Sequence, residues 1–147
     1  SPGPSSQLWP QLIYPYVKNL QVFHCPSQGT GTDQGWFGGY PSRSCYGCIS
    51  YNLSYPPNWD LTLGIYTRPS ETVLIGDSEA RDTTGRGFYL LQWPPWDTGS
   101  QSSRGRWADR HNNGCNAVFA DCHAKWIQGS SIKAYSASDP MWSPSVP

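Results

Sequence analysis

Residues 107–127 read WADRHNNGCNAVFADCHAKWI, and this stretch decides the fold. Two extended runs, Ala117–Ala120 and His123–Ile127, flank the pair Asp121-Cys122. Extended runs separated by a two-residue turn are typical of a β-hairpin. We therefore predict a two-stranded antiparallel hairpin centred on residues 121–122.

The predicted turn is unusual in its second residue. A two-residue type I′ turn needs φ > 0 at both central positions, which glycine adopts easily and cysteine does not. We expect Cys122 to be strained by about 1 kcal/mol relative to glycine, unless the turn is of another type or a disulfide compensates. Phe119 and Trp126 are expected to help cover the core, and His111 to hydrogen-bond the hairpin backbone.

The composition around the hairpin indicates one β-rich domain. The chain has 147 residues, with ten basic and ten acidic side chains, so it lacks the basic surface that binds nucleic acid or anionic membranes. Eight Trp and nine Tyr predict a core that is largely aromatic. The 15 Gly and 14 Pro are spread between aromatic runs and predict turns between short strands.

The order of segments predicts three regions. Residues 1–7 are expected to be a flexible linker, 8–128 a globular β-rich domain, and 129–147 a Ser/Pro-rich C-terminal segment. Pro15 argues against one continuous helix over residues 8–24, so we expect a helical turn near Tyr16–Leu20 and an extended Gln21–His24. Strands are predicted at 49–53 and 72–75, and no run approaches the roughly 20 apolar residues of a membrane span.

Residues 107–127 resemble the C-terminal signature of bacterial prepilin-like proteins, the type IV pilins and pseudopilins. That signature is a His, nine residues and then Asp-Gly; here His111 is followed by nine residues and Asp121. Residues 9–27, WPQLIYPYVKNLQVFHCPS, resemble the segment that follows the long N-terminal helix of that family. Two weaker resemblances occur in the same order as in the family: SYN at 50–52, and PSET at 69–72 followed by DS at 77–78.

The chain departs from the family pattern in two places. Cys122 replaces the glycine of the signature, and the processing site and hydrophobic assembly helix are absent from this chain. The resemblance implies an α+β, pilin-like globular domain dominated by an antiparallel β-sheet, without the long N-terminal helix. It also implies structural roles for the hairpin motif residues His111, Gly114, Asp121 and Trp126.

Carboxylates and imidazoles near the motif raise the alternative of a metal site. His111, Asp121 and His123 form one candidate ligand set. Ca²⁺ prefers carboxylate and carbonyl oxygens, and a spaced calcium-loop motif is not present. We expect solvated or capping aspartates, with Ca²⁺ binding as the alternative; the candidate oxygen ligands are Asp77, Asp82, Asp109 and Asp121.

The five cysteines predict an oxidising compartment, extracellular or periplasmic, and at most two intrachain disulfides. The candidates are Cys25, Cys45, Cys48, Cys115 and Cys122. In an ideal hairpin residue 115 faces residue 128 rather than 122, so bridges between segments are expected, for example Cys25 with Cys45 or Cys48. The remaining cysteine is a candidate for a link between subunits.

Other uses of the cysteines are less well supported. Cys45 and Cys48 form a C-x-x-C motif, but haem attachment needs a histidine directly after the second cysteine. Residue 49 is Ile, so the haem interpretation fails. A thioredoxin-like redox site needs a βαβ context that the sequence lacks. A zinc site stays open as an alternative, although its second pair is spaced too widely for a usual zinc knuckle; it would combine Cys45, Cys48, Cys115 and Cys122.

The sequence predicts a structural protein rather than an enzyme. It contains no nucleophile-elbow motif, and its three histidines have no evident triad partners. By resemblance, we expect a pilin or pseudopilin subunit of a cell-surface filament, which serves adhesion or type II secretion. Such a subunit associates with itself or with other pilin-like subunits, and reaches the membrane only through the missing helix.

A secreted carbohydrate-binding or adhesion module is the rival reading. Aromatic side chains in polar, Gly/Pro-rich loops stack on sugar faces as well as on other protein surfaces. The candidates for glycan stacking are Trp36, Trp59, Trp93 and Trp96. Asn52-Leu53-Ser54 also matches a glycosylation acceptor, which makes Asn52 a candidate for modification.

Overall fold

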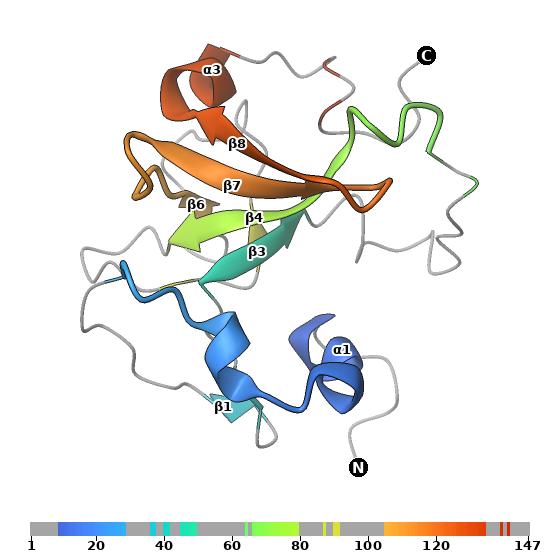
Figure 1. The fold of residues 1–147 in the computed structure, drawn as a ribbon, viewed down its shortest axis with the longest axis vertical. Helices are drawn as coiled ribbons and strands as arrows, with labels where there is room; N and C mark the ends of the chain where they lie inside the picture. The colour runs from blue at the N-terminus through green and yellow to red at the C-terminus, as the bar shows by residue number, and fades with distance from the viewer. Residues whose placement is uncertain are drawn as a thin grey trace.

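A β-sheet forms the centre of the protein (Figure 1). The computed structural model describes residues 9–28, 36–37, 40–41, 45–49, 64, 66–79, 87, 90–91, 105–134, 139 and 141. Its six-stranded sheet has the order β5-β3-β4-β7-β8, with β6 paired to β4. The strands are β3 (Tyr46–Ile49), β4 (Val73–Glu79), β5 (Leu90–Leu91), β6 (Arg106–Trp107), β7 (Gly114–Phe119) and β8 (Ala124–Gln128).

All pairings in this sheet are antiparallel except that of β3 with β5. A separate two-stranded sheet joins β1 (Trp36–Phe37) to β2 (Tyr40–Pro41). The predicted sheet-dominated α+β class is therefore confirmed. The strand predicted at 72–75 is part of the longer β4, whereas β3 ends at Ile49 and residues 50–53 lie outside the described residues.

The predicted hairpin is confirmed as β7 and β8, but its turn is of another type. Cys115 pairs with Ile127, whereas an ideal two-residue turn would place it opposite Gln128. The register is therefore shifted by one residue. The Phe119 N–H donates to the His123 carbonyl at 2.9 Å, and the Cys122 N–H donates to the Phe119 carbonyl at 2.9 Å. Only Cys122 of this turn has a positive φ, at 72°. A three-residue loop with one left-handed residue at its end replaces the expected type I′ turn.

A tight two-residue turn does occur, but before β7. Asn112 and Asn113 have φ of 54° and 57°, the left-handed pair that a type I′ turn requires. His111 and Gly114 close the turn with two mutual backbone hydrogen bonds of 3.1 Å. Asparagine tolerates this conformation because its short amide can bond the local backbone.

The core lies against β4, β7 and β8. It consists of Val73, Leu91, Cys115, Ala117, Phe119, Ile127, Ile132 and Met141, with Trp107 packed against it. The prediction for Phe119 is confirmed, while Trp126 is 45% exposed and packs outside this core. Helix α3 (Gly129–Ala134) contributes Ile132, so part of the segment after residue 128 packs onto the sheet.

The N-terminal segment is more helical than expected. Helix α1 spans Trp9–Val17 and includes Pro15, and the 3-10 helix η2 spans Leu20–Phe23. The helical turn predicted at Tyr16–Leu20 and the extended Gln21–His24 were therefore wrong. Pro10 lies in the first turn, where its missing N–H costs nothing, and Pro15 removes only one internal hydrogen bond from a short helix.

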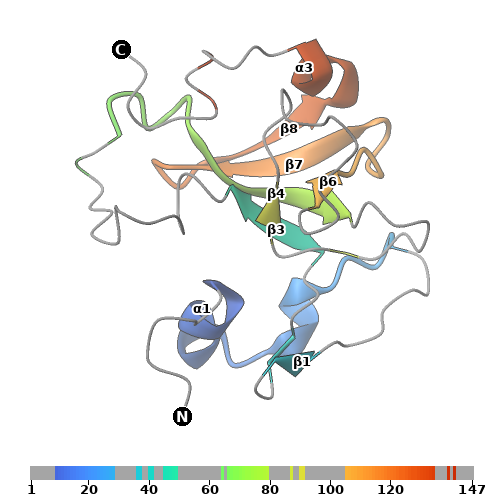
Figure 2. The same ribbon diagram turned by 180° about the vertical axis from the view of Figure 1, so that it is seen from behind.

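This segment lies at the opposite side of the sheet from α3. Figures 1 and 2 show α3 beside β8, while α1 and η2 lie beyond β3. The rings of Trp9 and Phe23 meet edge to face at 5.9 Å between centroids, which fixes α1 on η2. No helix within the described ranges is both long enough and apolar enough to cross a membrane.

Candidate functional site

Among the described residues, Asp77 in β4 is the one charged side chain that is buried. Its side chain is fully buried. The neighbouring strand β7 supplies two donors to Oδ2: the backbone N–H of Asn116 at 2.6 Å and its side-chain amide at 3.2 Å. A carboxylate that is shielded from water is tolerated only where hydrogen-bond donors or a positive charge compensate it. The stability of the buried Asp77 carboxylate therefore depends on the pairing of β4 with β7.

The positive charge comes from Arg110, in the turn before β7. Its Nη1 lies 3.7 Å from Asp77 Oδ1, and the Arg110 side chain is only 11% exposed. Nη2 donates to the Ser78 carbonyl at 2.7 Å, and Nη1 to the Cys45 carbonyl at 3.4 Å. Asp77 Oδ1 has no hydrogen-bond partner, so the charge of Arg110 is its main compensation.

His111 brings an imidazole to the same carboxylate. Its Nε2 lies 3.5 Å from Asp77 Oδ2 and also 3.5 Å from the Sγ of Cys25. A catalytic thiol–imidazole–carboxylate relay uses both ring nitrogens, one for the nucleophile and one for the acid. Here a single nitrogen, Nε2, faces both partners, so the arrangement differs from that relay.

Cys25 and Cys45 complete this group. The backbone N–H of Cys25 donates to the Sγ of Cys45 at 2.9 Å, and the Cys45 N–H donates to the Phe23 carbonyl at 2.8 Å. Both side chains are buried. Burial raises the pKa of the Cys45 thiol, and the Cys25 N–H and the charge of Arg110 partly oppose that rise.

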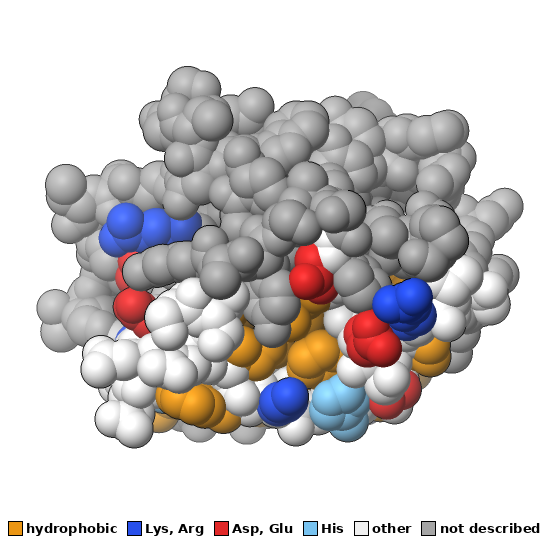
Figure 3. Space-filling view, turned by 90° about the horizontal axis from the view of Figure 1, so that it is seen from above, with side chains coloured by type: hydrophobic (Ala, Val, Ile, Leu, Met, Phe, Trp, Pro, Cys, Tyr) orange, Lys and Arg blue, Asp and Glu red, His pale blue; other side chains and the backbone are white. Residues whose placement is uncertain are grey.

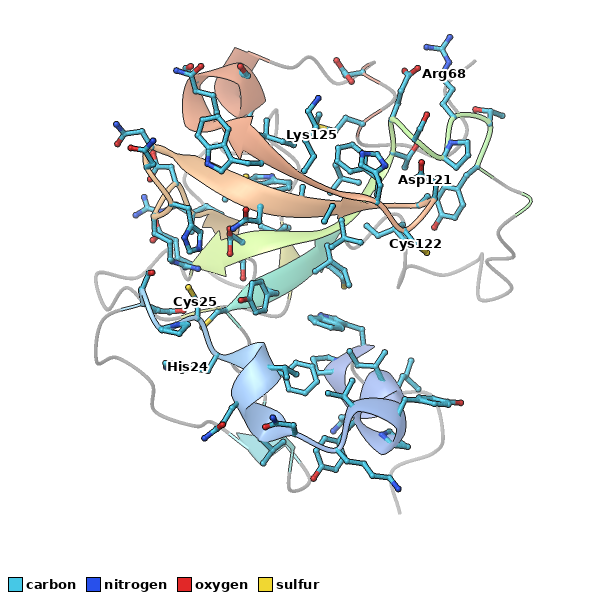
Figure 4. All side chains as sticks on the ribbon, in the orientation of Figure 1. His24, Cys25, Arg68, Asp121, Cys122 and Lys125 are labelled. Atoms are coloured by element: carbon cyan, nitrogen blue, oxygen red, sulfur yellow. The ribbon has the colours of Figure 1, made fainter. Side chains whose placement is uncertain are left out.

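We call these residues the Asp77 cluster, namely Cys25, Cys45, Asp77, Arg110 and His111. They come from the N-terminal segment, the residue before β3, the middle of β4 and the turn before β7. The cluster therefore joins four separate stretches of the chain at one end of the sheet. Figure 4 shows Cys25 beside this end, with Asp121 and Cys122 at the far tip of the hairpin.

Trp126 closes the outer side of the cluster. Its indole Nε1 donates to the His111 carbonyl at 2.8 Å, and its ring lies against Gly114, where a Cβ atom would overlap it. The hydrogen bond predicted between His111 and the hairpin is thus made by the main-chain carbonyl of His111. Its imidazole instead points inward, toward Asp77 and Cys25. A shallow hollow outside is lined by Ser27, Arg110, His111, Asn112 and Trp126.

The other end of the hairpin carries a small polar turn. Asp121 Oδ1 accepts hydrogen bonds from the backbone N–H of His123 at 3.1 Å and pairs with its Nδ1 at 2.5 Å. The backbone bond and then the imidazole bond lower the pKa of Asp121. The His123 ring stacks on Phe119 at 4.2 Å between centroids, so this end is ordered by local contacts.

An open hollow lies beside that turn. Figure 3 shows hydrophobic side chains gathered at its floor, with charged side chains and a histidine at the rim. Its lining is Ser70, Glu71, Phe119, His123, Lys125, Ile127, Asp139 and Met141. Both acidic and basic groups stand at the rim, so the hollow presents no single sign of charge to a ligand.

The candidate metal ligands do not converge. His111 and Asp121 lie before and after β7, at opposite ends of the strand. Asp77 is engaged with Asn116 and Arg110, whereas Asp109 is exposed. Within the described part of the chain, no group of three His, Cys, Asp or Glu side chains is arranged to hold a metal ion; Asp82 lies outside that part.

Only Cys25 and Cys45 among the five cysteines are placed in contact by the described hydrogen bonds. All five are free thiols in the structure, with Cys122 exposed and the other four buried. Burial raises the pKa of Cys48 and of Cys115 to about 12. Cys122 sits at the exposed hairpin tip, so the zinc set Cys45, Cys48, Cys115 and Cys122 is not brought together.

The glycan candidates fall outside what the structure describes. Trp59, Trp93, Trp96 and Asn52 are not among the described residues, and the side chain of Trp36 in β1 is not described either. These expectations stay predictions.

Sequence reasoning missed the role of Arg110 and the partnership of Cys25 with His111. Two signals were present. Asp77 directly follows the run VLIG at 73–76, which predicts a buried and compensated carboxylate, and Asn112-Asn113 before Gly114 is a strong turn signal. Contacts over 86 positions, as between Cys25 and His111, leave no local pattern in the sequence.

Comparisons with protein-family models, curated proteins and solved structures gave no match to this chain.

Proposed function

We propose that this chain is a non-catalytic structural subunit, of the pilin or pseudopilin kind, in an extracellular or periplasmic filament. The observation that carries the proposal is a set of exposed apolar side chains on α1 and η2. Tyr16 is 89% exposed, and five further apolar side chains reach solvent nearby. The six are Leu12, Ile13, Tyr16, Val17, Leu20 and Val22.

Contiguous exposed apolar side chains favour contact with another protein surface. Helix α1 carries no acidic or basic residue, so no charge on it opposes burial. By the resemblance of residues 9–27, this face lies where the assembly helix of a pilin-like subunit continues into its globular domain. Neighbouring subunits of the same kind are the partners that such a position would meet.

The Asp77 cluster supports the same proposal. It joins the N-terminal segment to the sheet through Cys25, Cys45 and Arg110. A subunit held in a filament through its N-terminal part needs a firm connection between that part and its sheet. In the same cluster one nitrogen of His111 faces both of its partners, unlike the two-nitrogen arrangement of a catalytic triad.

Antibody labelling of native material under the electron microscope tests the proposal. Antibodies raised against this chain should decorate fibres at a regular repeat. Label spread evenly over cell surfaces, without fibres, would contradict it. Binding of the isolated monomer to a glycan array would instead favour the carbohydrate-binding reading.

Sedimentation velocity of the purified chain tests the apolar face itself. We expect association that grows with concentration and is weakened by the paired change Leu12→Lys and Tyr16→Lys. Gln128→Lys, an exposed position in β8, is the matched control and should leave association unchanged. Equal association of the two variants would show that the apolar face does not mediate self-association.

A further inference from the structure

We propose that Cys25 and Cys45 form a disulfide that staples the N-terminal segment to the sheet. Two hydrogen bonds set their relation. The Cys25 N–H donates to the Cys45 Sγ at 2.9 Å, and the Cys45 N–H donates to the carbonyl of Phe23, two residues before Cys25, at 2.8 Å. A sulfur that close to the partner's backbone nitrogen places the two α-carbons within about 7 Å, the range that a disulfide spans. The proposal does not depend on the filament.

The positions of the other cysteines single out this pair. Cys48 lies inside β3, where it pairs with Ile75 of β4 and Leu90 of β5. Cys115 lies in β7 opposite Ile127, and Cys122 is exposed at the far tip of the hairpin. Cys25 comes after η2, and Cys45 immediately precedes β3. A bond between them would connect α1 and η2 covalently to the sheet.

The surroundings of the pair favour oxidation. His111 Nε2 lies 3.5 Å from Cys25 Sγ and can accept the thiol proton, which leaves the thiolate that attacks disulfides. Arg110 Nη1 donates to the Cys45 carbonyl at 3.4 Å, and its positive charge partly opposes the rise in the Cys45 pKa that burial causes. Burial raises the pKa of the Cys45 thiol, so Cys25, which lies beside His111, is the cysteine that reacts first.

The oxidant is a disulfide of the glutathione class. The Cys25 thiolate attacks one sulfur of glutathione disulfide, forming a mixed disulfide and releasing one glutathione thiolate. Cys45 Sγ then attacks the Cys25 sulfur, which forms the intrachain bond and releases the second glutathione. The two cysteine protons end on the two glutathione thiols, and the two electrons lost by the cysteines reduce the oxidant.

Peptide mapping of the full chain tests the proposal. The folded protein is equilibrated with glutathione disulfide, denatured with N-ethylmaleimide, digested without reductant and analysed by mass spectrometry. We expect a cross-linked peptide pair that contains residues 25 and 45 and is lighter by two hydrogen atoms than the free peptides. Cys48 and Cys115 should be alkylated in full, and Cys122 alkylated or joined to glutathione.

Two variants sharpen the result. Cys122→Ser is the matched control and should leave the cross-linked peptide unchanged. Cys45→Ser should abolish it and leave Cys25 alkylated or joined to glutathione. If Cys45→Ser does not fold, the map of the unchanged chain still decides the question.

Three outcomes would overturn the proposal. One is complete alkylation of both Cys25 and Cys45 after the glutathione treatment. Another is a bond from Cys25 to any other cysteine of the chain. The last is one equivalent of zinc that copurifies with the reduced chain, found by elemental analysis, and keeps both thiols from oxidation.

Discussion

The indole nitrogen of Trp126 donates a hydrogen bond to the backbone carbonyl oxygen of His111 at 2.8 Å, across 15 positions of sequence. This bond ties β8 to the Asn112-Asn113 turn that precedes β7. It also holds the indole ring flat against Gly114, which has no side chain to displace it. One end of the hairpin is thus closed by Trp126, and the other by the left-handed residue Cys122.

Replacing Gly114 by alanine is expected to destabilise the protein by about 2–3 kcal/mol, as overpacking of a closed site does. An added Cβ would overlap the Trp126 ring and lie 2.6 Å from the Ile127 carbonyl oxygen, which belongs to the backbone and cannot swing away. Gly129→Ala is the comparison and should cost less, because its Cβ would lie 3.0 Å from the Asn113 carbonyl oxygen, a tight contact but a milder one. Urea unfolding measures both, and equal losses would contradict the account of Gly114.

Cys122→Gly should stabilise the folded chain by about 1 kcal/mol, since glycine adopts φ > 0 without the Cβ penalty. Cys122 has φ of 72° and an exposed side chain, so little packing is lost. Cys122→Ala keeps the penalty and should be close to neutral. The midpoints of urea unfolding under reducing conditions are compared for the three proteins. A glycine variant no more stable than the alanine variant would contradict the positive φ of residue 122.

Asp77→Asn is expected to cost about 3 kcal/mol, because it leaves the mostly buried Arg110 without its counter-charge. The exposed pair of Arg68 and Glu71, 3.5 Å apart, provides the control. Glu71→Gln should change stability by less than about 0.5 kcal/mol. If Asp77→Asn proves as mild as Glu71→Gln, the cluster is not what connects the N-terminal segment to the sheet.

Alkaline pH should weaken the fold through the buried thiols. Burial raises the pKa of Cys48 and Cys115 from 9.0 to about 12. A pKa raised on folding gives stability that is complete below the unfolded value and is lost as pH rises through the folded one. Between pH 8 and pH 10 we expect a loss of about 1.4 kcal/mol per thiol in the free energy of unfolding.

Urea unfolding at the two pH values measures this loss. Cys48→Ala should remove about half of it, while Cys122→Ser should leave it unchanged. The raised pKa of Tyr46 and of Tyr66, also caused by burial, adds a loss of the same sign at higher pH. Stability that is flat from pH 8 to pH 10 would contradict the burial of both thiols as free groups.

Local sequence patterns predicted the hairpin well and its turn poorly. Extended runs on each side of residues 121–122, joined by a turn, are enough to place β7 and β8. The turn type depends on a single dihedral angle, and Asp-Cys does not specify it as Asp-Gly would. The N-terminal helix was missed since Pro15 disfavours a helix locally, whereas packing of Trp9 on Phe23 supplies stability from outside it.

By itself, then, the sequence determined a β-rich chain with a C-terminal hairpin, a cysteine-rich composition and no strong net charge. Only the tertiary structure decided that Cys25, Cys45, Asp77, Arg110 and His111 meet. Strand periodicity and turn propensity act over a few neighbouring residues and so are written in the local sequence. The meeting of distant polar groups instead follows from sheet order and from the need to compensate a buried carboxylate, which depend on the whole chain at once.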